Sequence, residues 1–149
     1  MDVLVAVDGS PGAKRALAYA TDVADATDGA VTAVHAVDPD VYEAGGSEPI
    51  SGRSDAEQRL VVRSVEDAEE RGLDVLDDAA RAAKERGVEI TTDLLYGDPV
   101  GEITTYAEEG GFDTVVVGHR GGTARADLLL GSVAKALVER ATVPITVVH

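Results

Sequence analysis

The sequence of 149 residues contains no cysteine and no tryptophan, and aromatic residues make up only 3% of it. Without cysteine the chain can form no disulfide, no thiolate nucleophile and no cysteine metal site. The few aromatic side chains leave little surface on which nucleic-acid bases could stack. No apolar run approaches the roughly 20 residues of a membrane-spanning helix, and no basic leader precedes the first apolar run. We therefore expect a cytoplasmic protein.

Basic residues are scarce as well. The chain has 13 lysines and arginines against 28 acidic residues, which gives a formal net charge of −15. The excess negative charges repel one another in dilute buffer. High salt screens this repulsion, because the Debye length falls to about 3 Å at 1 M. We infer a salt-rich cytoplasm, as in halophiles; an ordinary acidic cytosolic protein is the alternative. The charge also argues against nucleic acids and anionic membranes as partners.

Strand-like apolar runs alternate with segments of helical periodicity. Strands are predicted at Val3–Val7, Val31–Val37, Val88–Leu95, Asp113–Val117 and Ile145–Val148. This alternation is typical of a parallel sheet with helices on both faces. The fold class predicted is therefore α/β with a doubly wound sheet, and the length suits a single domain over residues 1–149.

The helix boundaries follow from local signals. Ser10 and Asp98 are good N-caps, and a proline follows each of them at the first helical position. A long helix is predicted from about Asp55 to Arg86, in which Gly72 is a candidate point of interruption or bending.

A glycine motif lies between the fourth strand and the last helix. It reads Gly118-His-Arg-Gly121, then nine residues, then Gly131-Ser132. Glycine lets the backbone approach an anion and donate N–H groups, and a helix N-terminus adds free amides and partial positive charge. In a doubly wound sheet, ligands bind beyond the carboxyl ends of the strands. The motif therefore predicts a phosphate-binding backbone at that edge.

Each of these residues also has a plain structural interpretation. The glycines of the motif could be turn or cap glycines, and Ser132 could be an ordinary N-cap of the following helix. Asp8 could merely end its strand and cap the turn at Ser10. His119 is typical of an exposed loop residue rather than a ligand, and His35 is predicted to be a packed core residue. Three separated histidines do not indicate a metal site.

Other nucleotide-binding signatures are missing. The first turn lacks G-x-G-x-x-G of the Rossmann dehydrogenases, and Gly131-Ser132 lacks the lysine of a Walker A motif. A phospho-accepting receiver domain needs an acidic pair after its first strand, and only Asp8 is available there.

Over nearly its whole length the sequence resembles the universal stress protein (UspA-like) family. The matching segments are Val3–Ser10, Val34–Pro39, Gly97–Pro99, the glycine motif and Val143–Val148. The motif is that of the ATP-binding branch. The resemblance implies a five-stranded, Rossmann-like sheet, a homodimer that pairs through the last strand, ATP with Mg²⁺ or Mn²⁺ on its phosphates, and a regulatory role under stress with an unknown protein partner.

The resemblance also implies a set of binding residues. Asp8 would lie beside the base and ribose, and the Val37 backbone would meet the adenine. The glycines of the motif would line the ribose and phosphates. The full implied set is Asp8, Gly9, Ser10, Val37, Gly118, Gly121, Gly131, Ser132 and Val133. Ala134 stands where many members of the family have a hydroxyl residue, which removes one side-chain contact to the terminal phosphate.

The leading functional prediction is thus an ATP-binding regulatory module. One alternative is a slow ATPase in which Asp8 or His119 orients water. The other is a dimeric scaffold that binds no nucleotide.

Overall fold

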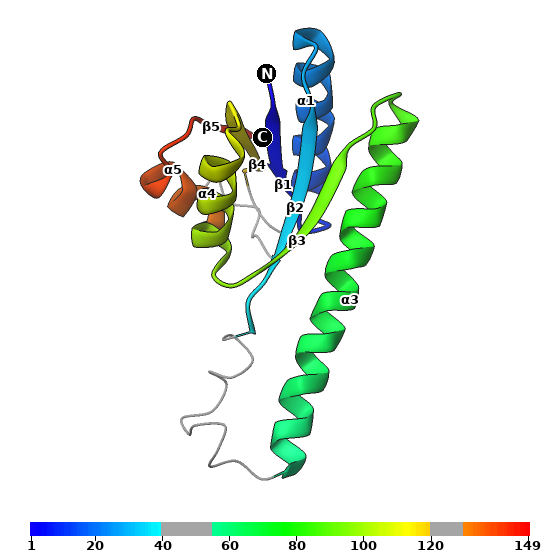
Figure 1. The fold of residues 1–149 in the computed structure, drawn as a ribbon, viewed down its shortest axis with the longest axis vertical. Helices are drawn as coiled ribbons and strands as arrows, with labels where there is room; N and C mark the ends of the chain where they lie inside the picture. The colour runs from blue at the N-terminus through cyan, green and yellow to red at the C-terminus, as the bar shows by residue number, and fades with distance from the viewer. Residues whose placement is uncertain (40–54, 120–129) are drawn as a thin grey trace.

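The computed structural model describes residues 1–39, 55–119 and 130–149, and for residues 55–63 only the backbone. Strands and helices alternate along the chain (Figure 1). The order is β1 (Val3–Ala6), α1 (Pro11–Thr27), β2 (Val31–Val37), α3 (Asp55–Glu85), β3 (Thr91–Tyr96), α4 (Pro99–Gly110), β4 (Thr114–Gly118), α5 (Ser132–Arg140) and β5 (Ile145–Val148).

The five strands form one parallel sheet in the order β3-β2-β1-β4-β5. The chain builds outward from β1 to β3 and then returns to the other side of β1. The topological switch point therefore lies between β1 and β4, where a ligand crevice is expected in this class of sheet. The predicted α/β fold with a doubly wound parallel sheet is confirmed.

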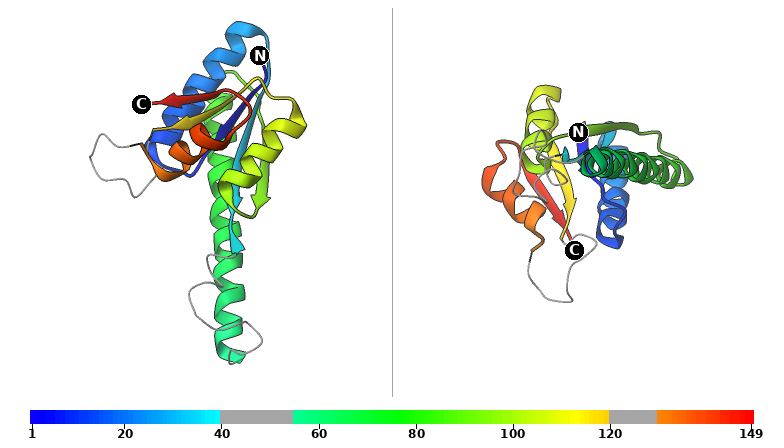
Figure 2. Two further views of the ribbon diagram at one scale, coloured as in Figure 1. Left: turned by 90° about the vertical axis from the view of Figure 1, so that its left-hand side faces the viewer. Right: turned by 90° about the horizontal axis from the view of Figure 1, so that it is seen from below.

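Helices α1 and α3 cover one face of the sheet, and α4 and α5 cover the other (Figure 2). Successive strand residues point to opposite faces, so Val3 and Val5 pack beneath α1, whereas Leu4 packs against α4 and α5. All three side chains are fully buried. The continuous apolar run of β1 thus reflects burial on both sides.

Helix α3 is continuous over 31 residues, about 46 Å at 1.5 Å per residue, and its first half extends beyond the sheet (Figure 1). The predicted interruption at Gly72 is wrong. A Cβ at that position would lie 2.8 Å from His35 Cδ2 and 2.8 Å from Leu94 Cδ1. Gly72 therefore lets the helix pack closely on β2 and β3 instead of bending it.

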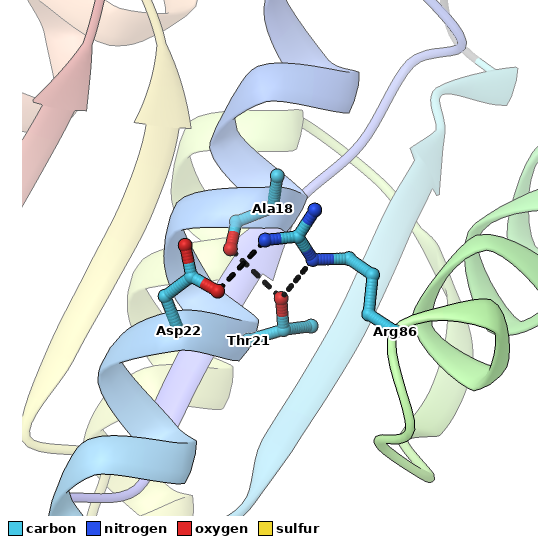
Figure 3. Close-up of polar contacts among 4 residues, drawn as sticks. All are labelled: Ala18, Thr21, Asp22 and Arg86. Atoms are coloured by element: carbon cyan, nitrogen blue, oxygen red, sulfur yellow. Dashed lines mark hydrogen bonds and ion pairs between the residues drawn. The ribbon is translucent and has the colours of Figure 1, made fainter.

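Arg86, just after α3, links this helix to α1 (Figure 3). Its Nε donates to Thr21 Oγ1 at 3.1 Å, and its guanidinium lies 2.7 Å from a carboxylate oxygen of Asp22. Thr21 in turn donates to the carbonyl of Ala18. None of the helices in the described parts of the chain is long and apolar enough to cross a membrane.

Candidate functional site

Helices α1 and α4 begin with the side-chain caps that the sequence predicts. Ser10 Oγ accepts a hydrogen bond from the amide of Ala13 at 3.1 Å. Asp98 Oδ2 accepts one from the amide of Gly101 at 3.0 Å. In both helices a side chain therefore accepts a hydrogen bond from one amide of the first turn.

Helix α5 begins without such a cap. Gly131 holds the N-cap position, with φ −61° and ψ 154°, and no side chain in the described parts of the chain accepts a hydrogen bond from the first turn. The interpretation of Ser132 as an ordinary N-cap is wrong, because Ser132 is the first helical residue and is exposed. The amides of Ser132, Val133 and Ala134 precede the first intrahelical donor, Lys135; we call these three groups the α5 amide cluster.

Backbone hydrogen bonds fix the start of α5 to the sheet. The amide of Gly131 donates to the carbonyl of His119 at 2.7 Å, and the amide of His119 donates to Val148 at the end of β5 at 2.8 Å. The ring of His119 is half-buried and stacks on the ring of His149, with centroids 4.4 Å apart. The backbone of His119 therefore links the start of α5 to the end of β5. Its half-buried ring is not that of the exposed loop residue that the sequence predicts.

The α5 amide cluster borders a cavity of ≈ 180 Å³ at the carboxyl ends of β1 and β4. Six of the nine implied residues line it: Asp8, Ser10, Gly118, Gly131, Ser132 and Val133. The switch point between β1 and β4 thus brings together two segments of the glycine motif and the first turn of the chain. Residues of α4, Pro99 and Ile103, also line the cavity; the sequence marked Pro99 as the start of a helix but neither residue as part of the site.

Gly118 has a packing role that the sequence could not reveal. A Cβ there would lie 2.7 Å from the carbonyl carbon of Gly12 and 3.2 Å from the amide nitrogen of Ala13. These are backbone atoms of the first turn of α1, so they cannot rotate away. The missing side chain lets α1 and β4 meet at the floor of the cavity.

Asp8 and Gly9 shape the turn between β1 and α1. Asp8 is exposed, and its Oδ1 accepts a hydrogen bond from the amide of Ser10 at 2.9 Å, which is the capping role named as its alternative. Gly9 has φ +82°, in the left-handed region that favours glycine, and it lines neither cavity. Asp8 also faces the cavity, so its carboxylate is available to a ligand through its remaining lone pairs.

A second cavity of ≈ 300 Å³ adjoins the first on the side of α3. Asp8, His35 and Ala36 line both cavities, and Val37 lines the second. The Val37 carbonyl already accepts a hydrogen bond from the amide of Gly97 at 2.9 Å. The prediction that His35 is a packed core residue is wrong, because its ring is half-buried and forms part of both walls.

The geometry does not test two expectations, the role of Gly121 and the presence of a metal ion. Gly121 lies outside the described residues. Among the residues that the structure does describe, no group of three histidine, aspartate or glutamate side chains could hold a metal ion. A cation in this region would thus take its oxygen ligands chiefly from the phosphates of a bound ligand.

Residues 1–149 match the family described as the universal stress protein family. A universal stress protein of Methanocaldococcus jannaschii is 31% identical over 146 residues, which cover 98% of this chain and 80% of that protein. The universal stress protein UspA from Lactobacillus plantarum has a similar fold, with a TM-score of 0.81, 21% identity, and coverage of 100% of this chain and 97% of that one.

One similar structure was solved with a nucleotide. It is a universal stress protein in complex with cAMP, which superimposes on this chain with a TM-score of 0.70 at 26% identity and covers 100% of this chain and 97% of its own.

Proposed function

The chain belongs to the universal stress protein family, and we propose that it is an ATP-binding regulatory module of that family. The observation that carries this proposal is the α5 amide cluster, which borders a cavity at the switch point of the sheet and which no side chain of residues 1–39, 64–119 or 130–149 caps. Free helix-terminal amides favour phosphate groups. This is how a chain with a net charge of −15 would bind a polyanion without a lysine-rich pocket.

The two adjoining cavities suit a nucleotide that spans them. Its phosphates would bind the α5 amide cluster, and its ribose and base would extend past Asp8 toward Val37. Gly121, as in the family, would add a backbone contact to the phosphates. The cAMP complex of a similar protein supports a nucleotide ligand in this fold. Mg²⁺ or Mn²⁺ would bind the phosphate oxygens and reduce their repulsion by nearby carboxylates.

We also propose that the protein forms a homodimer, whose surface a partner protein recognises when nucleotide is bound. Strand β5 forms one edge of the sheet, and its four residues, Ile145–Val148, are half-buried. An open edge strand with apolar side chains can pair with a second copy of itself. The high acidic charge would be screened in the salt-rich cytoplasm that we propose as its setting.

Titration calorimetry with ATP and Mg²⁺ at high salt tests the proposal. We expect saturable binding that requires Gly131 and is competed by other adenine nucleotides. If no binding occurs at millimolar ATP, and the purified protein still forms a dimer, the nucleotide-free scaffold takes the place of this proposal.

Phosphate release provides the test of the alternative enzymatic function. A slow ATPase that uses Asp8 or His119 to orient water would release phosphate steadily, and His119→Ala or Asp8→Ala would abolish the release. A rate no faster than that of a Gly131→Asp variant would reject hydrolysis.

A further inference from the structure

His35 is held at the boundary between the two cavities by a specific hydrogen bond. Its Nδ1 lies 2.8 Å from the carbonyl oxygen of Val7, the residue that follows β1. A carbonyl can only accept, so Nδ1 carries the proton. In the neutral ring the other nitrogen, Nε2, is then a hydrogen-bond acceptor, and this tautomer follows from the Val7 contact.

The described residues leave the Nε2 atom without a hydrogen-bond partner. In the same residues only Thr104 has a fully buried side-chain polar atom without a partner, so Nε2 keeps accessible surface. His35 therefore carries an unpaired acceptor with accessible surface, on a residue that lines both cavities.

Helix α3 fixes the ring from the opposite side. A Cβ at Gly72 would lie 2.8 Å from Cδ2 and 3.4 Å from Nε2 of His35, so the backbone of α3 packs directly against this edge of the ring. The ring is thus held between the Val7 carbonyl and the helix. Little side-chain entropy remains to be lost when Nε2 receives a hydrogen bond.

The charged residues that line the second cavity with His35 come from three segments. Asp8 follows β1, Asp38 follows β2, and Arg71 lies on α3, while Ala68 and Val75 supply apolar surface. The two carboxylates accept hydrogen bonds and the guanidinium donates them. Among the uncharged side chains of this wall, His35 alone offers an acceptor held in one orientation.

We propose that His35 is a specificity-determining residue for the nucleobase. This inference rests on the proposed function. Its Nε2 accepts a hydrogen bond from an exocyclic amino group, so the second cavity prefers bases with an amino group, such as 6-aminopurine, over 6-oxopurines. A 6-oxo base would place a carbonyl lone pair against the Nε2 lone pair and leave both groups without a donor.

The affinity ratio between ATP and ITP tests this, because the two differ at the purine 6-position. We expect the wild-type protein with Mg²⁺ at high salt to bind ATP about tenfold or more tightly than ITP. His35→Asn keeps an amide that can donate to Val7 but does not reach the position of Nε2, so the ratio should fall to about twofold or less. His35→Gln, whose amide reaches that position, should restore part of it. His149→Phe, which alters a histidine outside both cavities, should keep the wild-type ratio.

The outcomes separate this inference from the proposed function. If the wild-type protein binds ATP but shows no preference over ITP, or if His35→Asn folds and keeps the full preference, the role of His35 is wrong and nucleotide binding stands. If the wild-type protein binds neither nucleotide, both proposals fall. Circular dichroism of each variant establishes that it is folded, and His35→Gln supplies the second variant if His35→Asn does not fold.

Discussion

Three helices begin at the same edge of the sheet, and α5 begins differently from α1 and α4. In α1 and α4 a serine or aspartate side chain accepts a hydrogen bond from the first turn, and a proline occupies the start of the helix. In α5 a glycine stands at the N-cap and no side chain accepts from the first turn. Among the described residues, side chains cap the first turns of α1 and α4 but not that of α5.

The difference matters because an unsatisfied helix end is unfavourable. A side-chain N-cap contributes about 1 kcal/mol, so α5 forgoes a stabilisation that the other two helices have. The same amides, which border the cavity lined by Gly118 and Gly131, can donate hydrogen bonds to an anion. We expect stability and ligand affinity to oppose each other at the start of α5 and not at the start of α4.

The largest effect is expected from giving α5 the cap that it lacks. Gly131→Asp places a carboxylate where it can accept from the α5 amide cluster, and the backbone at φ −61° allows a side chain there. The new carboxylate would repel the phosphates of ATP and would occupy amides that otherwise donate to them. We therefore expect ATP binding to weaken by about 100-fold or more. The same change should raise the free energy of unfolding by about 0.3 kcal/mol, because glycine is itself a fair N-cap residue. Calorimetric titration and denaturant unfolding at high salt measure the two quantities.

Two variants isolate the cause of that effect. Gly131→Asn caps without charge, so its loss of affinity should be smaller than that of Gly131→Asp. Asp98→Ala removes the cap of α4, and we expect it to lower the free energy of unfolding by about 1 kcal/mol without weakening ATP binding. A Gly131→Asp protein that binds ATP as tightly as the wild type would contradict the assignment of the α5 amide cluster.

A second large effect is expected at Gly118, where α1 meets β4. Gly118→Ala would force its Cβ to within 2.7 Å of the Gly12 backbone. Either the helix or the strand must shift, and we expect a loss of about 1–3 kcal/mol in the free energy of unfolding. The control is Gly101→Ala in α4, where the nearest atom to an added Cβ is Asp98 Oδ2 at 3.4 Å. That variant should gain about 0.5–1 kcal/mol from helix propensity. Equal stability of Gly118→Ala and the wild type would refute the close packing.

Local signals in the sequence predict the start of α1 and α4 but not the roles of the glycines. The caps at Ser10 and Asp98 depend on residues within one turn of each other, so the pattern alone reveals them. The need for glycine at positions 72 and 118 comes from Leu94, His35 and Gly12, which are distant in sequence. A single sequence cannot show such contacts, and Gly72 was therefore predicted wrongly as a point of bending.

The location of the site was predictable because it follows from the strand order and from a local motif. Strand order places the carboxyl ends of β1 and β4 together, and the glycine motif follows one of them. The sequence does not tell which nitrogen of His35 is protonated, because this depends on the carbonyl of Val7, which follows the neighbouring strand β1. It also does not tell which of Gly131 and Ser132 is the N-cap, since both residues are common there.

A smaller effect should distinguish the two serines. Ser10 Oγ is buried and caps α1, so Ser10→Ala should lower the free energy of unfolding by about 1 kcal/mol. Ser132 is exposed at the first position of α5 and caps nothing, so Ser132→Ala should change stability by less than about 0.5 kcal/mol. If its hydroxyl contacts a phosphate, ATP affinity should fall about fivefold. Denaturant unfolding and ATP titration of both variants give the comparison, and a stability loss at Ser132 equal to that at Ser10 would contradict the N-cap assignment.

The smallest effect is expected at Arg86, whose side chain contacts Thr21 and Asp22 of α1. Arg86 and Asp22 are 43% and 69% exposed in their side chains, so their ion pair should be worth only about 0.5 kcal/mol and should weaken with salt. The hydrogen bond to Thr21, which is 1% exposed, is shielded from salt and should persist. Arg86→Met should therefore lose stability at low and at high salt, and the loss should be smaller at high salt. Arg81→Met removes the 3.5 Å pair with Asp78 within one helix and should change little at either salt concentration. If the two variants behaved alike, Arg86 would hold α1 no better than an ordinary surface ion pair.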